Sequence, residues 1–182
     1  MRQLKYHESK LLRKVDFLWQ KEGDVRENGI LRRYHLQDRE DYRKYNKICG
    51  VIRSLAARLK KLKSDSRFRA LTTDALLTKL YNMGLIPTKK SLLQCEKLTV
   101  SALCRRRLPV VLVKLKMAEG VKQAATMVEQ GHVRVGPNSV TDPATLVTRS
   151  MEDFVTWTDT SKIRRKIKEY NNNVDDYELL GI

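Results

Sequence analysis

Apolar residues recur at helical spacing near the start of the chain. Their positions, every three or four residues, predict a helix over Glu8–Gln20. The segment that follows, KEGDVRENGI, carries Gly23 and Gly29, and glycines are typical of breaks between elements. We therefore expect an irregular segment after the first helix.

The longest hydrophobic pattern predicts a helix over Asp38–Leu62, with one apolar stripe and a basic side opposite to it. Eight basic residues and one acid lie between Asp41 and Lys63, a surplus larger than solubility requires. Simple solvation of the helix is the plainer interpretation. The surplus nevertheless indicates a secondary basic face made of Arg43, Lys44, Lys47, Arg58 and Lys61.

A third helix is predicted over Thr73–Met83, and Gly84 suits the left-handed position at its C-terminal end. The segment LIPTKKSLLQCEKL reads as a connector with a short helical turn. Past residue 104, Pro109 fits the first turn of a helix that should end near Ala118. A second helix should then run through Gln130, with a glycine cap after it.

Alternation with period two predicts a strand in HVRV, where Val133 and Val135 share one face. GPNSVTDP has the composition of turns, and ATLVT and DFVTWT read as further short strands. TSKIRRKIKEY predicts a basic helix capped by Thr160 or Ser161. The last residues are acidic.

The first helix of the hairpin is apolar on two sides. Leu108, Leu112 and Leu115 share one face, and a second face of Val110, Val113 and Met117 lies nearly opposite. Such a helix is covered on both sides. We expect one side to meet the small sheet and the other to meet the N-terminal helices. Arg107 and Lys114 lie on the edge between them, which should stay open for a ligand.

Charge narrows the function. The 182 residues include 37 Lys and Arg against 21 Asp and Glu, a net charge of +16, which favours a polyanionic partner. An anionic membrane surface is the alternative. No run of apolar residues approaches the length of a membrane span and the first residues lack a hydrophobic signal core, so we expect no membrane partner.

Catalytic and metal chemistry find little support in the sequence. Cys49, Cys95 and Cys104 are not closely spaced, and His residues are scattered, so we expect buried free thiols and no metal site. Phosphate-binding loops and metalloprotease or esterase motifs are missing. We therefore predict no catalytic residues, no cofactor and no small-molecule substrate.

The stretch RRRLPVVLVKLKMAEGVKQAATMVEQGHVRVGPNSVTDPATLV resembles the S4 RNA-binding family. The family pattern is a basic R-R-L start, a helical hairpin, then G-H-x-x-V and a small twisted sheet. The resemblance implies an α+β fold, in which an N-terminal helical region packs on the S4-type domain and a basic helix follows. We expect a helical region over 1–103, an S4-like domain over 104–160, and a basic helix with an acidic tail over 161–182.

The resemblance also implies an RNA-binding surface. This sequence departs from the family pattern at three places. Ala125 stands where an arginine is usual, and Lys116 stands where a glycine is usual. Val135-Gly136-Pro137 replaces the usual V-N-G turn. The lost arginine suggests a protein-binding surface formed by Val121, Ala125 and Val128. Arginine holds a phosphate through parallel N–H bonds. The expected RNA contacts are Arg105, Arg106, Arg107, Lys114, Lys116, Lys122, His132, Arg134 and Asn138.

Almost the whole chain resembles the nucleolar branch of this family in the small-subunit processome. That resemblance implies a nucleolar RNA-binding assembly factor for 18S rRNA processing, which binds U3 snoRNA and promotes its pairing with precursor ribosomal RNA. It also implies M-phase phosphoprotein ten and other processome proteins as partners. A structural small-subunit ribosomal protein is the alternative. A pseudouridine synthase is disfavoured, because only about 100 residues precede the S4-like segment.

Overall fold

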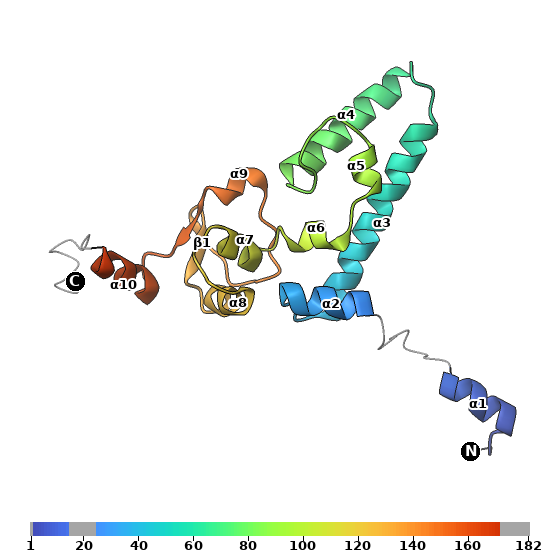
Figure 1. The fold of residues 1–182 in the computed structure, drawn as a ribbon, viewed down its shortest axis with the longest axis horizontal. Helices are drawn as coiled ribbons and strands as arrows, with labels where there is room; N and C mark the ends of the chain where they lie inside the picture. The colour runs from blue at the N-terminus through green and yellow to red at the C-terminus, as the bar shows by residue number, and fades with distance from the viewer. Residues whose placement is uncertain (1, 15–24, 172–182) are drawn as a thin grey trace.

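The computed structural model describes residues 2–14 and 25–171. These residues form two packed units with a helix beyond each end (Figure 1). The α+β fold expected from the sequence is confirmed, since the chain is mostly helical and carries one small antiparallel sheet. Helix α1 (Tyr6–Lys14) lies apart from both units in the view of Figure 1. The part of the predicted first helix from 15 to 20 lies outside the described residues.

The helical unit spans residues 25 to 104. It consists of α2 (Val25–Tyr34), α3 (Arg39–Lys61), α4 (Arg67–Asn82), α5 (Leu93–Glu96) and α6 (Val100–Cys104). The stripe predicted on the longest helix is confirmed, because Tyr45, Cys49, Ile52, Ala56 and Leu59 of α3 are buried. Helix α4 is followed, two residues after its last residue Asn82, by a left-handed Gly84 with φ of 74°, as expected for a glycine cap.

The hairpin–sheet unit spans residues 108 to 157. Helices α7 (Leu108–Lys114) and α8 (Val121–Glu129) form the predicted hairpin, and Gly131 has a φ of 74° after it. Strands β1 (Val133–Val135), β2 (Asn138–Ser139) and β3 (Val155–Trp157) form an antiparallel sheet in the order β2-β1-β3. The short helix α9 (Arg149–Glu152) precedes β3. Helix α10 (Lys162–Tyr170) follows it, capped by the Ser161 hydroxyl as predicted.

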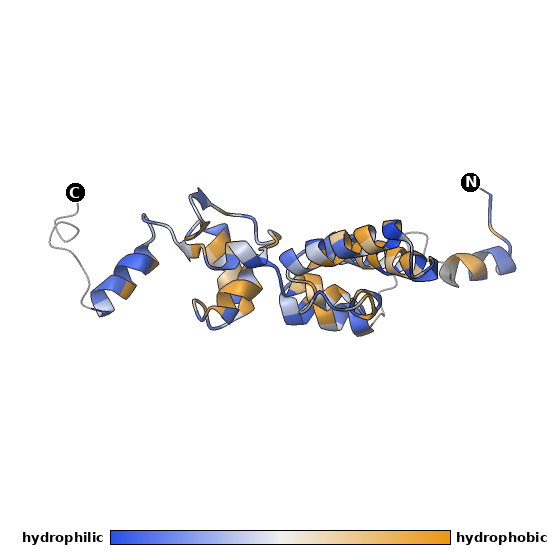
Figure 2. Cartoon of the chain, turned by 90° about the horizontal axis from the view of Figure 1, so that it is seen from above, coloured by the Kyte–Doolittle hydropathy of each residue, from blue (hydrophilic) through white to orange (hydrophobic). Residues whose placement is uncertain are grey.

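Each unit has its own apolar core, and hydrophobic stretches, orange in Figure 2, occur in both units. Leu108, Val111 and Leu112 of α7 are buried in the core of the hairpin–sheet unit. Val110, on the other side of α7, packs against the core of the helical unit, as expected. Val113 and Met117 instead pack on the hairpin–sheet core, and Leu115 is exposed, so those three assignments are wrong.

Five predictions about the elements differ from the structure. Residues 25–30 of the segment read as irregular belong to α2, in which Gly29 has no atom within 4 Å of where a Cβ would stand. Helix α7 ends at Lys114, before the expected Ala118, and α4 begins six residues before Thr73. ATLVT is not a strand: Leu146 forms an isolated bridge with Arg107. Part of the expected turn pairs as β2 instead, after a two-residue Gly-Pro loop.

Candidate nucleic-acid interface

The three consecutive arginines between α6 and α7 have different environments. Arg105 is exposed, whereas the whole residues Arg106 and Arg107 expose 8% and 3% of their surface. The expectation that Arg107 lies on an open basic edge is therefore wrong, and Arg106, which was also expected to contact RNA, is buried as well. The chain turns between the two helices at this point, so successive side chains are directed at different neighbours.

Arg107 joins the hairpin–sheet unit to α3. Its guanidinium donates hydrogen bonds to the Asp41 carboxylate at 2.8 Å and to the Tyr45 hydroxyl at 3.1 Å. Burial raises the pKa of the Tyr45 hydroxyl, although the adjacent guanidinium acts in the opposite direction. A buried cation needs such partners, because its lost hydration is otherwise uncompensated. Arg107 therefore holds the two units together.

Arg106 makes a second connection. Its Nε donates to the Val147 carbonyl at 2.9 Å, and one terminal nitrogen donates to Glu152 at 3.0 Å. The guanidinium passes directly over Gly84, where an added Cβ would stand 2.9 Å from the Arg106 Nε. The glycine thus serves both the left-handed backbone and the path of this side chain.

Glu152 binds two cations. It accepts hydrogen bonds from Lys114 and Arg106, and its side chain is 14% exposed. The Lys114 hydrogen bond is the main cause that lowers the pKa of the Glu152 carboxyl, and the Arg106 contact adds to it, while burial opposes both. Lys114 is exposed, but its ammonium is already paired, so Glu152 closes the edge that was predicted to be open.

Arg149 is a connecting residue that sequence reasoning missed. Its guanidinium donates to the Ile86 carbonyl at 2.9 Å and lies 4.2 Å from the centre of the Tyr81 ring. These contacts join α9 to the end of α4. A cation over an aromatic face is stabilised by the ring's negative surface. Nothing in the spacing of the sequence indicates this contact, because its partners lie more than 60 residues away.

The loop between α7 and α8 exposes two of the expected RNA-binding lysines. Lys116 has a φ of 60°, the left-handed region in which glycine is unstrained. That geometry explains why a glycine is usual at this position of the pattern. Lys116 and Lys122 are exposed, and neither has an ion-pair partner among the described residues. They remain open to phosphate.

The sheet side of the unit is less open than expected. Arg134 is paired with Asp159 at 2.7 Å and with the Thr156 hydroxyl at 3.0 Å. His132 is half-buried, and its Nδ1 lies 3.1 Å from the Ser161 hydroxyl. Asn138 is exposed on β2, one of the two outer strands of the sheet. The expected residues near the β1–β2 turn are therefore assembled, but an aspartate competes for the arginine.

Two further basic surfaces are exposed. The secondary basic face of α3, made of Arg43, Lys44, Lys47, Arg58 and Lys61, is exposed along its length. Helix α10 carries five basic residues among nine and is predominantly hydrophilic (Figure 2). Lys162 and Lys166 of α10 are exposed, and neither has an ion-pair partner in the described part of the chain. The charge pattern of the sequence predicted both helices as basic.

The protein-binding surface predicted on α8 is wrong. Ala125 is 3% exposed and Val128 is fully buried, and only Val121 is partly accessible. Val128 belongs to the core of the hairpin–sheet unit, together with Ala124. The alanine that stands where the family pattern has an arginine therefore packs inside the fold, and these residues offer no continuous surface to a partner.

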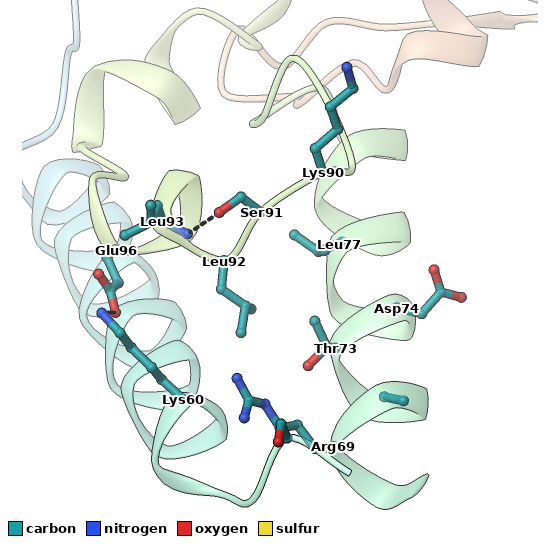
Figure 3. A pocket seen from close by; sticks show the side chains of 12 residues that line it. Lys60, Arg69, Thr73, Asp74, Leu77, Lys90, Ser91, Leu92, Leu93 and Glu96 are labelled. Carbon is teal, nitrogen blue, oxygen red and sulfur yellow. Dashed lines mark hydrogen bonds and ion pairs between the residues drawn. The ribbon is translucent and has the colours of Figure 1, made fainter. Parts of the chain in front are cut away.

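A pocket of about 550 Å³ lies between α3, α4 and the segment around α5 (Figure 3). Two of its three cations are already engaged: Lys60 lies 3.3 Å from Glu96, and Arg69 donates to the Leu62 carbonyl at 2.7 Å. Leu77 and Leu92 point into it from opposite sides. With two carboxylates also in its wall, this pocket does not suit a phosphate.

The cysteines are buried free thiols, as predicted. Burial raises the pKa of the Cys104 thiol to about 11, which keeps it protonated and unreactive near neutral pH. In the described residues, no cluster of His, Cys, Asp and Glu could hold a metal ion. No helix there is long and apolar enough to cross a membrane.

Comparison with known proteins places the two units in known families. Residues 3–105 match the Ribosomal protein S4/S9 N-terminal domain, and residues 106–153 match the S4 domain. The chain is 55% identical over 181 residues to the U3 small nucleolar ribonucleoprotein protein IMP3 of Homo sapiens, covering 98% of each. The Saccharomyces cerevisiae protein of that name is 53% identical, with 98% of this chain and 99% of that protein covered. The Caenorhabditis elegans protein is 45% identical, with 99% of each covered. The chain therefore belongs to the IMP3 family of U3 small nucleolar ribonucleoprotein proteins, with an S4/S9 N-terminal domain followed by an S4 domain.

Proposed function

We propose that this protein is an RNA-binding assembly factor of the small-subunit processome, located in the nucleolus. It binds U3 snoRNA and promotes the pairing of U3 with precursor ribosomal RNA. The family relationship over 98% of the chain carries this proposal. The exposed cations of the S4 domain and of α10 support it, because a phosphate backbone is bound mainly by such charges.

The RNA-binding residues we propose are those whose charge remains available. They lie at the start of the hairpin, in its loop and on α10, with the α3 face as a second surface. Arg106 and Arg107 are not among them, since their guanidinium groups are buried against acids. The proposed primary contacts are Arg105, Lys116, Lys122, Lys162 and Lys166.

The mechanism needs no catalytic residue and no cofactor. Two RNA strands repel each other through their phosphates, and a cationic protein that contacts both strands lowers this repulsion. Each neutralised phosphate also releases counterions, so the stabilisation weakens as salt rises. The pairing equilibrium shifts by the difference between the protein's affinity for the duplex and for the separate strands.

The proposed protein partner is M-phase phosphoprotein ten, together with other processome proteins. The relatives are named as ribonucleoprotein components, which supports an assembly with further proteins. The surface predicted for this partner on α8 is buried, so another surface must serve.

Fluorescence-monitored annealing of short U3 and precursor-RNA oligonucleotides tests the proposed function. We expect saturating protein to increase the rate or yield of the duplex at low salt, without nucleotide or metal cofactor. The effect should fade by a few hundred millimolar salt. Charge reversal of Lys116 and Lys122 should reduce it, while charge reversal of Lys90, an exposed lysine outside the proposed contacts, serves as the control. Unchanged rate and yield would assign annealing to another component.

A further inference from the structure

A second groove of about 550 Å³ lies between α3 and α4, on the side of α4 away from the pocket in Figure 3. Thr72, Ala75 and Lys79 line this groove, whereas Thr73 and Leu77 line the pocket. Most of its wall is apolar. Leu55, Leu59, Leu62, Phe68 and Leu76 form that wall.

The groove leaves large apolar side chains in water. Phe68 is 65% exposed, Leu55 41% and Leu62 39%. Removing apolar surface from water is favourable, so this surface carries binding energy that the fold does not use. Contiguous exposed apolar surface of this kind is typical of interaction sites.

The apolar surface continues along α3 beyond the groove. Ile48 and Val51 are also exposed, at 41% and 59%. With Leu55 and Leu62 they follow spacings of three, four and seven residues, which place them on one side of the helix. Ile48 and Leu62 are 14 residues apart, so the strip is roughly 20 Å long at 1.5 Å per residue. A partner helix of about four turns would cover it.

The charge at the groove selects the kind of partner. Arg58 and Lys79 are the charged residues of its described lining. A second copy of this chain would bring these same cations together in a two-fold contact, because such an interface is made by the same patch on both subunits. Like charges across an interface are costly. RNA phosphates would bind the cations, but they would make no favourable contact with the leucine side chains.

We propose that the α3–α4 groove is the docking site for an amphipathic helix of a protein partner. The apolar face of that helix covers Phe68, Leu55 and Leu62, and its Asp or Glu residues pair with Lys79. Helices commonly bind in grooves in this way, with apolar anchors at intervals of three and four residues. The inference rests on the proposed function, because the partner is M-phase phosphoprotein ten, the protein partner proposed there.

Substitution of two matched phenylalanines tests the inference. Phe68 in the groove is 65% exposed, and Phe154 on the hairpin–sheet unit is 61% exposed. Both tolerate a charge without loss of core packing. The affinity of the full chain for the partner protein and for a U3 oligonucleotide is measured by calorimetry for wild type, Phe68→Glu and Phe154→Glu. We expect Phe68→Glu to weaken partner binding by roughly 30-fold, as for a central anchor, and Phe154→Glu to leave it unchanged.

The charge component has its own variant. Lys79→Glu should also weaken partner binding, and more strongly at low salt, since it opposes the acids of the docked helix. All three variants should keep wild-type RNA affinity, which separates this inference from the RNA-binding function.

The possible failures are distinguishable. Wild-type partner affinity in Phe68→Glu would overturn the groove and leave the proposed function in place. A loss of RNA affinity in Phe68→Glu would overturn it in favour of an RNA surface. Dimerisation of the wild-type chain that Phe68→Glu abolishes would overturn it in favour of self-association. If the wild-type chain does not bind the partner protein, the partner proposal and the groove both fail, while RNA binding stands or falls on its own measurement.

Discussion

At the scale of single residues, the basic run before α7 divides into one exposed cation and two buried ones. Arg105 is exposed, whereas Arg106 and Arg107 pair with Glu152 and Asp41. The sequence contains one hint of this division. Asp41 is the single acid in a segment with eight basic residues, and it is the residue that Arg107 contacts. A partner 66 positions away cannot be identified from spacing alone.

Arg107→Ala should destabilise the protein by about 3 kcal/mol, because it leaves the half-buried Asp41 carboxylate and the Tyr45 hydroxyl without their partner. Arg105→Ala, at the exposed position, should change stability by less than about 0.5 kcal/mol. Urea unfolding of the three proteins measures both values. Equal midpoints for Arg107→Ala and Arg105→Ala would show that the arginine does not hold the units together.

The Glu152 ion pairs should make stability depend on pH. Because the folded-state pKa of this carboxyl is lowered, its contribution is complete above the unfolded pKa of about 4.3 and is lost as the pH falls through the folded pKa. The difference in unfolding free energy between wild type and Glu152→Gln should therefore be constant near neutral pH and shrink below about pH 4. Asp153→Asn controls for the loss of one negative charge. A difference that persists at the lowest pH would point to packing rather than charge.

At the scale of elements, the hydrophobic periodicity of the sequence predicted several helices and strands that the structure confirms. The α3 stripe, the hairpin of α7 and α8 and strand β1 follow from residues that recur at 3.6 or 2 positions. Helix α2 was missed because Gly29 was read as a break. A glycine on an exposed helix face costs only about 1 kcal/mol, and tertiary packing overrides that cost.

The two sides of α7 illustrate the same limit. Leu112 and Leu115 were assigned to one face, but Leu112 is fully buried and Leu115 is 38% exposed, because the helix ends at Lys114. Leu112→Ala should cost about 2–5 kcal/mol through the cavity it leaves, and Leu115→Ala should cost less than about 1 kcal/mol. Thermal or urea unfolding of the two variants checks this. Similar losses would mean that both leucines are core residues.

At the scale of the whole molecule, the two units are joined by arginines from both sides of the junction. Arg107 reaches α3, Arg149 reaches the end of α4, and Arg106 passes over Gly84. The exposed basic surfaces therefore lie on both units and beyond them: on α3 in the helical unit, on the hairpin loop in the hairpin–sheet unit, and on α10, which follows that unit (Figure 1). Net charge predicted a polyanionic partner, but it does not indicate which cations pair with acids inside the fold. The burial of each side chain in the structure shows which cations these are.

The salt dependence of RNA binding tests the central claim most directly, namely that the exposed cations bind RNA and the buried arginines do not. Five phosphate contacts on a single strand imply a slope of about −3.5 for log affinity against log salt. A variant with Arg105, Lys116 and Lys122 changed to alanine removes three contacts, so its slope should be about −1.4 with unfolding free energy unchanged. A slope near zero for wild type, or a slope that the triple variant does not alter, would contradict the account.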